Sequence, residues 1–379
     1  MAKDLSPSTH PLTPPLTEEV WLDWLRLLRS RRVGVTTFFR LMDEHGSAAR
    51  ALEVLPSVAA TAGVTDYRPC DIKAVRTEWQ AALQAGATPI AFGSDAYPAL
   101  LAEIPDPPPI LWCIGDPSLL QRPMIALVGA RNASSVGTRM ARRLATDLGA
   151  AGHVVVSGLA RGIDTAAHLA ALDTGTVAVM AGGVDVVYPA ENAVLGQEIQ
   201  DKGLRISESP MSLVAQARHF PRRNRIVSGL ARAVIVVEAA AKSGSLITAR
   251  TALDQGRDVF AVPGHPFDPR ASGCNMLIRD GATLVRSAKD VLDALDMASD
   301  VGLEVAETPA DPPRPATETR ETLDLHQRIL DRLGPSPVAE DQLIRDLKAP
   351  ARSVSPEIVT LELEGRVRRE PGGLLVRVS

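Results

Sequence analysis

Residues 124–183, MIALVGARNASSVGTRMARRLATDLGAAGHVVVSGLARGIDTAAHLAALDTGTVAVMAGG, alternate regularly between two kinds of segment. Short apolar runs at 124–130, 153–158 and 176–183 are rich in valine, alanine and isoleucine, as buried strands are. The stretches between them, 136–148 and 163–172, carry apolar residues at helical spacing. This order of strand, helix, strand, helix and strand predicts a doubly wound, mainly parallel sheet.

The alternation continues beyond residue 183. Further strands are predicted at 205–208, 233–239 and 258–264, with helices near 224–230 and 246–254. We therefore expect one extended Rossmann-like parallel sheet domain over residues 86–295. An apolar strand at 110–114 follows the run PDPPP, which predicts a segment entering at the edge of the sheet.

The sequence on either side of this domain has a different character. Residues 1–16 contain several prolines and no period, so we expect a disordered tail. Residues 17–85 predict a small helical domain, and VGVTTFFRLMDEHGS within it faintly resembles a sterile-alpha or helix-hairpin-helix pattern, in which a glycine turn can face a phosphate. Plain packing of short helices remains the alternative.

The C-terminal part predicts a linker and a third domain. Residues 296–320 are rich in proline and charge, as linkers are. Residues 321–379 predict three helices, the third starting at Ser355-Pro356, and a basic hairpin about Pro371. This arrangement is typical of a winged helix. Its presumed recognition helix carries glutamates, so we expect an accessory module rather than a reader of base sequence.

Composition excludes several classes of protein. The chain has 379 residues, 45% of them hydrophobic, and a formal net charge of −4, so a nonspecific DNA coat is not indicated. Its three cysteines, Cys70, Cys113 and Cys274, are widely spaced, which predicts neither a disulfide framework nor a metal site. No apolar run approaches the ~18 residues of a membrane span. We expect a cytoplasmic protein without membrane insertion.

Positive charge is concentrated in one region. Between Met211 and Arg250 seven basic residues stand against the single carboxylate of Glu238: Arg218, Arg222, Arg223, Arg225, Arg232, Lys242 and Arg250. Guanidinium groups suit phosphate, and the neighbouring Phe220 offers a face on which an unstacked base can lie, while Asn224 adds polar contacts. The alternative is a solvated helix face. Because acids at helical spacing are missing, we favour a site for single-stranded nucleic acid.

Glycine-rich loops follow the predicted strands. VGARNASS (128–135) and SGLARGIDTAAH (157–168) would form a crevice at the carboxyl edge of the sheet, with a phosphate at the N-terminus of the helix after Ser134 and Ser135. A dinucleotide cofactor is not indicated, because the GxGxxG pattern is incomplete. Asp164 is expected to cap and His168 to pack. For Tyr188, stacking and a structural role both remain open.

These motifs together resemble the DNA-processing protein A family (DprA, also called Smf). The resemblance covers nearly all of residues 97–286 and rests on these segments in the order of the family: VGARNASS, SGLARGIDTAAH, GGVDVVYPAEN, SESP, HFPRRNRIVSGL, EAAAKSGSLITA, GRDVFAVPG and GCNMLIRDGA. It implies a protein that binds single-stranded DNA, protects incoming DNA, helps load the RecA recombinase during natural transformation, and forms a homodimer.

The resemblance also assigns residues. The DNA pocket would comprise Arg131, Ser157, Gly158, Phe220, Arg222, Arg223, Asn224, Arg225 and Lys242. Where some relatives have a lysine, this chain has Ala190-Glu191, so one phosphate contact is expected to be missing, with Arg222-Arg223 as the substitute. Leu253 and Leu284 are candidates for the dimer interface, and core packing is their alternative.

The competing class is an enzyme. Rossmann-like nucleotide hydrolases of the lysine-decarboxylase-like group share the glycine loops but carry a catalytic glutamate in a PGGxGTxxE loop. This chain has KSGSLITA at the comparable position, without a carboxylate. We therefore expect no catalytic residue, no metal and no cofactor.

Overall fold

The computed structural model describes residues 13–302, 320–333, 338–347, 349, 351–363, 365–370 and 374–377. The chain divides into two compact units, residues 1–302 and 303–379, which are described separately below. Most of the predicted tail (1–12) and of the predicted linker (303–319) lies outside the described residues.

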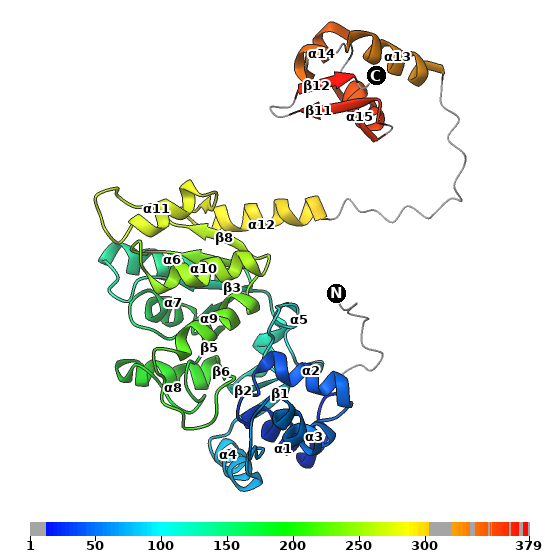
Figure 1. Ribbon diagram of the computed structural model, residues 1–379. Helices are drawn as coiled ribbons and strands as arrows, with labels where there is room; N and C mark the ends of the chain where they lie inside the picture. Colours follow the sequence, from blue (N-terminus) through cyan, green and yellow to red (C-terminus); the bar gives the residue numbers. More distant parts are fainter. Residues whose placement is uncertain are drawn as a thin grey trace. The chain divides into compact units, whose positions relative to one another are not determined.

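The first unit is built on a nine-stranded sheet in the order β1-β2-β6-β5-β4-β3-β7-β8-β9. In this order, the seven strands from β6 through β3 to β9 run parallel to one another, whereas β2 is antiparallel to both of its neighbours, β1 and β6. The predicted parallel sheet is confirmed (Figure 1). Its strands are β1 (Thr88–Ala91), β2 (Ile110–Gly115), β3 (Met124–Val128), β4 (Val154–Ser157), β5 (Thr176–Val179), β6 (Leu204–Ser207), β7 (Ala233–Val236), β8 (Asp258–Ala261) and β9 (Thr283–Leu284).

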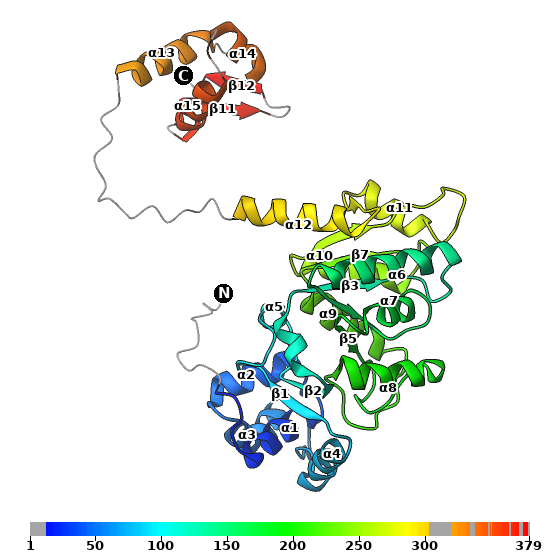
Figure 2. The same ribbon diagram turned by 180° about the vertical axis from the view of Figure 1, so that it is seen from behind.

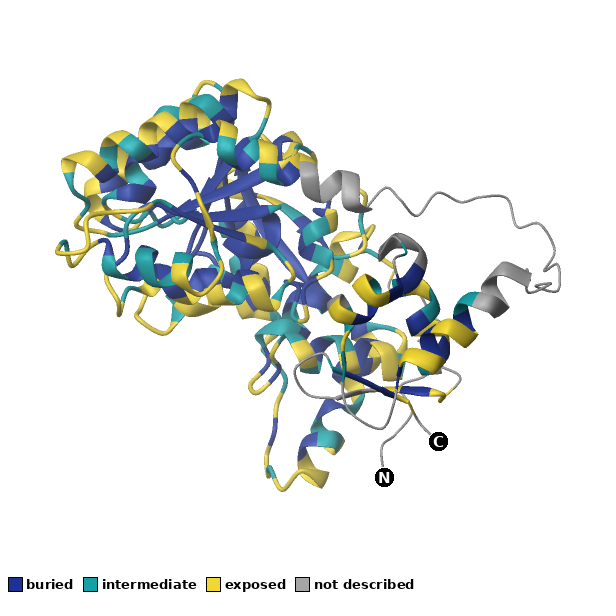
Figure 3. Cartoon of the chain, turned by 90° about the horizontal axis from the view of Figure 1, so that it is seen from above, coloured by how far each residue is buried: buried dark blue, intermediate teal, exposed yellow. Residues whose placement is uncertain are grey.

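Helices cover both faces of this sheet (Figures 1 and 2). One face packs against α6 (Ser135–Ala150), α7 (Ile163–Ala171), α8 (Ala193–Lys202) and α12 (Ala288–Gly302). The other packs against α5 (Ala99–Ala102), α9 (His219–Leu230), α10 (Gly244–Asp254) and α11 (Ser272–Arg279). The interior strands between the two layers are almost wholly buried, as Figure 3 shows. Because neither face of these strands is open to solvent, their sequences are mainly continuous apolar runs.

The N-terminal helices continue the core of the sheet. They are α1 (Glu18–Arg29), α2 (Val35–His45), α3 (Ala48–Thr61) and α4 (Ile72–Gln84). Their apolar faces share one cluster with Ala91 of β1 and with Ile110, Trp112 and Ile114 of β2. The N-terminal helices and the sheet are therefore joined by a common buried surface.

The predicted entry strand needs a correction. β2 is an interior strand, because β1 pairs with it on one side and β6 on the other. β1 was not predicted from the sequence; it contains only four residues, TPIA, one of them a proline. A strand this short carries too few residues for a period to be visible.

The second unit has the predicted winged-helix architecture. Helices α13 (Arg320–Arg332), α14 (Glu340–Leu347) and α15 (Ala351–Leu363) pack with a three-stranded sheet of β10 (Val338–Ala339), β11 (Val367–Glu370) and β12 (Leu374–Arg377). The third helix begins at Ala351, earlier than predicted, so Pro356 lies inside it. Residues 371–373 of the predicted hairpin turn lie outside the described residues. Among the residues described, no helix is both long and apolar enough to cross a membrane.

Candidate nucleic-acid interface

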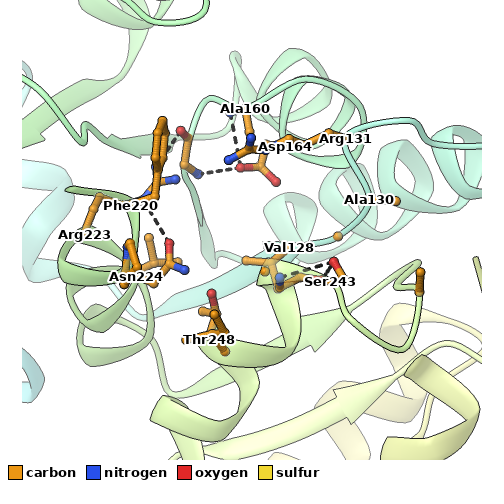
Figure 4. Close-up of a pocket in the computed structure, with 18 of the residues that line it drawn as sticks. Val128, Ala130, Arg131, Ala160, Asp164, Phe220, Arg223, Asn224, Ser243 and Thr248 are labelled. Carbon is orange, nitrogen blue, oxygen red and sulfur yellow. Dashed lines mark hydrogen bonds between the residues drawn. The ribbon is translucent and has the colours of Figure 1, made fainter. Parts of the chain in front are cut away.

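A pocket of about 820 Å³ lies at the carboxyl edge of the sheet, where β3, β4 and β7 end. Such edges are where open α/β sheets bind ligands. Its lining includes six residues predicted from the sequence, namely Arg131, Gly158, Phe220, Arg223, Asn224 and Lys242. Figure 4 shows α9 residues on one side, Ala160 of the loop after β4 and Asp164 of α7 across from them, and Ser243 and Thr248 nearby.

Phe220 is the centre of an aromatic and cationic cluster in this pocket. Its ring centroid lies 5.8 Å from that of Tyr188. The guanidinium carbon of Arg131 lies 5.0 Å from the Phe220 centroid, within the range of a cation–π interaction. Tyr188 also lines the pocket and is exposed, so both rings can be reached by a ligand. The structure thus favours the stacking interpretation of Tyr188 over a purely structural one.

Arg223 stabilises the wall of the pocket. Its side chain is buried, and Nη1 donates to the backbone carbonyls of Gly158 at 2.5 Å and Val179 at 2.6 Å. A Cβ at position 158 would collide with this guanidinium group, so glycine is needed there. Burial lowers the pKa of Arg223 to about 10, and the nearby carboxyl of Asp164 opposes this shift. Arg223 therefore stays charged at neutral pH and joins α9 to the loop after β4.

Asp164 and His168 stabilise that same loop. The Asp164 carboxylate accepts from the backbone N–H groups of Gly158 at 3.1 Å and Ala160 at 3.3 Å. His168 is fully buried; its Nε2 accepts from the N–H of Leu159 and its Nδ1 contacts the Thr176 hydroxyl. Burial and then Arg223 lower the pKa of His168 to about 3, so the ring is neutral. The predicted packing role of His168 is confirmed, whereas the predicted capping role of Asp164 is wrong: Asp164 lies inside α7, and its carboxylate binds N–H groups of the loop before that helix.

The predicted phosphate site at the start of α6 is wrong. Both the N–H and the hydroxyl of Ser134, the N-cap, donate to the carboxylate of Glu238. The Glu238 carboxylate lies so close to the first turn of α6 that a Cβ on Gly137 would overlap it. The positive end of the helix dipole is thus occupied by an acid of the same chain. Glu238 follows β7, which pairs with β3, and this neighbouring position is what brings it to Ser134.

Three predicted site residues do not line this pocket. Ser157 is buried and its hydroxyl donates to the Leu127 carbonyl. Arg225 is buried, with ion pairs to Glu208 at 2.5 Å and Asp106 at 3.0 Å. Arg222 is exposed, and its Nη2 lies 3.9 Å from Glu208. Acids distant in the sequence therefore balance part of the arginine run, which a search at helical spacing could not reveal.

Three exposed cations line the pocket: Lys242, Arg131 and Arg270, of which Arg270 pairs with Asp268. Among the residues described, neither Lys242 nor Arg131 makes an ion pair. Their charges are available to an anionic ligand. Glu191, at the position where some relatives have lysine, pairs with Arg161. Arg222 and Arg223 were predicted to replace the contact of that lysine. Because Arg223 is buried, only Arg222 offers a solvent-exposed charge.

The sequence analysis did not single out several polar residues that line the pocket. Asn132, Ser243 and Thr248 are among them. Asn132 lies in the loop after β3, and Ser243 directly follows Lys242. Their proximity in sequence to predicted residues was the available signal.

The two dimer candidates are exposed. Leu253 on α10 has 58% of its surface accessible and Leu284 on β9 has 42%, so their alternative as core residues is wrong. No group of three or more potential metal ligands occurs among the residues that the structure describes.

Three family models match the chain. Residues 88–296 match DNA recombination-mediator protein A, residues 18–81 match the DprA-like N-terminal HHH domain, and residues 309–373 match the DprA winged helix domain.

Relatives cover much of the chain. Protein Smf of Synechocystis is 37% identical over 73% of this chain and 76% of its own length. DNA processing protein DprA of Bacillus subtilis is 44% identical over 55% of this chain and 72% of its own length.

Two solved structures are also similar. DNA processing protein A of Streptococcus pneumoniae superposes with a TM-score of 0.57 at 36% identity, covering 73% of this chain and 93% of that one. The second is DNA processing protein A of Helicobacter pylori, whose structure describes its single-stranded DNA binding mode. It superposes with a TM-score of 0.52 at 30% identity, covering 56% of this chain and 98% of that one.

Proposed function

Because this chain belongs to the DNA recombination-mediator protein A family, we propose that it binds single-stranded DNA in the pocket around Phe220. In this role it protects incoming DNA and helps to load the RecA recombinase during natural transformation, which implies a cytoplasmic location. The observation that carries the proposal is the Phe220 ring in one pocket with the exposed cations Arg131 and Lys242, neither of which makes an ion pair with another described residue.

The chemistry of the pocket fits a single strand better than a duplex. Bases that are free to leave a stack can lie on the Phe220 and Tyr188 rings while the phosphates meet Arg131 and Lys242. A duplex keeps its bases stacked on one another, so no base is free to stack on these rings. The activity that we propose is binding, without catalysis.

The hydrolase alternative is less well supported. A nucleotide bound in the usual Rossmann manner would place its phosphate at the N-terminus of α6. That position faces the Glu238 carboxylate, which would repel a phosphate. The pocket carboxyl Asp164 is engaged by two backbone N–H groups, which leaves it poorly placed to act as a base.

Arg131→Ala and Lys242→Ala are each expected to weaken binding of a dT oligonucleotide and to lower the slope of log affinity against log salt by about 1, because each removes one phosphate contact. Fluorescence anisotropy at several salt concentrations measures both quantities. Arg142→Ala is the matched control, since Arg142 is exposed on α6 and does not line the pocket. Wild-type affinity in the Arg131 variant, or equal affinity of the wild type for duplex, would contradict the proposal.

We also propose a homodimer that uses Leu253 and Leu284. Both leucines are exposed, and their elements, α10 and β9, each contact β8. They therefore supply apolar area for a self-complementary contact. Two pockets on one strand would then raise the overall affinity.

Leu253→Arg or Leu284→Arg is expected to give a folded monomer with lower affinity for long single strands, because a charge would be buried in the interface. Light scattering at micromolar concentration measures the mass. Leu169→Arg is the control, since Leu169 on α7 is 41% exposed and lies on the opposite face of the sheet. A monomeric wild type would refute the dimer.

A further inference from the structure

A second groove of about 750 Å³ lies beside the first pocket. It is bordered by the turn between α1 and α2, by Asp106 before β2, by the segments after β5 and β6, and by α9. The turn between α1 and α2 belongs to the segment whose glycine pattern suggested contact with a phosphate. That segment does not line the first pocket.

The second groove adjoins the first pocket. Pro221 and Arg223 line both. The first pocket follows the carboxyl ends of β3, β4 and β7, and the groove follows those of β5 and β6. Because these strands are adjacent in the order β6-β5-β4-β3-β7, the two depressions form one path along the same edge of the sheet.

Most of the charges that line the groove are already engaged. Of its four arginines, Arg29 pairs with Glu78 outside the groove, and Arg223 is buried against backbone carbonyls. The buried Arg225 pairs with both lining carboxylates, Asp106 and Glu208. Arg222 is left as an exposed cation at the junction with the first pocket: its side chain is 65% accessible, and it approaches Glu208 only to 3.9 Å. Its charge is therefore available to a ligand passing from one depression to the other.

The rest of the groove suits nucleobases and sugars. Leu213 provides half-buried apolar surface beside the largely buried Met180 and Val33, and the exposed Thr36 provides a hydroxyl on the side of the N-terminal helices. Apolar walls with a cation at the rim can accept successive nucleotides without reading their sequence.

We propose that the single strand held at Phe220 continues into this groove, so that its next nucleotides lie between α9 and the α1–α2 turn. The inference rests on the proposed function and extends it: the N-terminal helices form one wall of the DNA path. Arg222 contacts the phosphate that passes from the first pocket to the second groove.

The test places a carboxylate on the far wall. Thr36→Glu faces the groove, and it should fold normally because an acid in the first turn of α2 favours the helix. Affinity is measured for dT strands from about 4 to about 16 nucleotides, the range that single-strand sites of this size cover. We expect unchanged affinity for the shortest strand and a loss of about threefold to tenfold for the longest, the size of one phosphate contact.

Thr77→Glu is the matched control, because Thr77 is an exposed threonine on α4 that does not line the groove. Thermal melting establishes that both variants are folded. If the two variants bind long strands equally well while short strands still bind, the groove is not part of the path, and the proposed function stands. If Thr36→Glu weakens short and long strands alike, the separate groove contact is refuted. If the wild type binds no strand of any length, the proposed function itself fails.

Discussion

Phe220→Ala is expected to weaken binding of single-stranded DNA by about 1–3 kcal/mol, a loss of about 5-fold to 150-fold, because one base loses its stacking partner. The variant also removes the ring over which the Arg131 guanidinium lies at 5.0 Å. That cation then loses the contact that orients it toward the pocket. Equilibrium fluorescence anisotropy with a dT oligonucleotide measures the change.

Two control variants separate stacking from other effects. Phe220→Tyr keeps an aromatic face and should retain most of the affinity. Phe267→Ala removes a phenylalanine that is 90% exposed and does not line the pocket, so its binding should equal that of the wild type. An alanine variant at position 220 that binds as tightly as the tyrosine variant would show that no base stacks there.

Arg223→Met is expected to lower the free energy of unfolding by about 3–5 kcal/mol, the cost of removing one partner from a buried charge network. The variant leaves the carbonyls of Gly158 and Val179 without their donor, and it takes the nearest cation from the buried Asp164. Burial already raises the pKa of Asp164, so losing the opposing cation should raise it further. Urea denaturation followed by circular dichroism measures the loss.

The adjacent Arg222→Met is the matched control for stability. Arg222 lies on the same helix but is exposed, so its replacement should change the free energy of unfolding by no more than about 0.5 kcal/mol. Adding Asp164→Asn to Arg223→Met should recover part of the lost stability, because the uncompensated carboxylate is then gone. Equal stability of the two methionine variants would mean that Arg223 has no supporting role.

The elements of the fold could largely be predicted from the sequence. Strands buried on both faces give uninterrupted apolar runs, and the helices between them repeat at 3.6 residues, so both signals are local. The exceptions include the strands β1 and β9, whose four and two residues are too few to show a period, and the helices α5, α8, α11 and α12, which were not predicted. Family motifs identified six of the residues that line the pocket before any geometry was known.

Which charges face solvent was decided by the tertiary structure. Arg222, Arg223 and Arg225 are equivalent in a composition count. In the structure, however, Arg223 donates to carbonyls of the loop after β4 and of β5, and Arg225 pairs with Asp106, more than a hundred residues earlier. Glu238 likewise reaches the start of α6 only because β7 lies beside β3. The sequence by itself determined the doubly wound sheet and the cationic, aromatic character of the site. The tertiary structure decided which cations remain available to DNA, because a charge is neutralised by whatever the fold places within a few ångströms of it, regardless of distance along the chain.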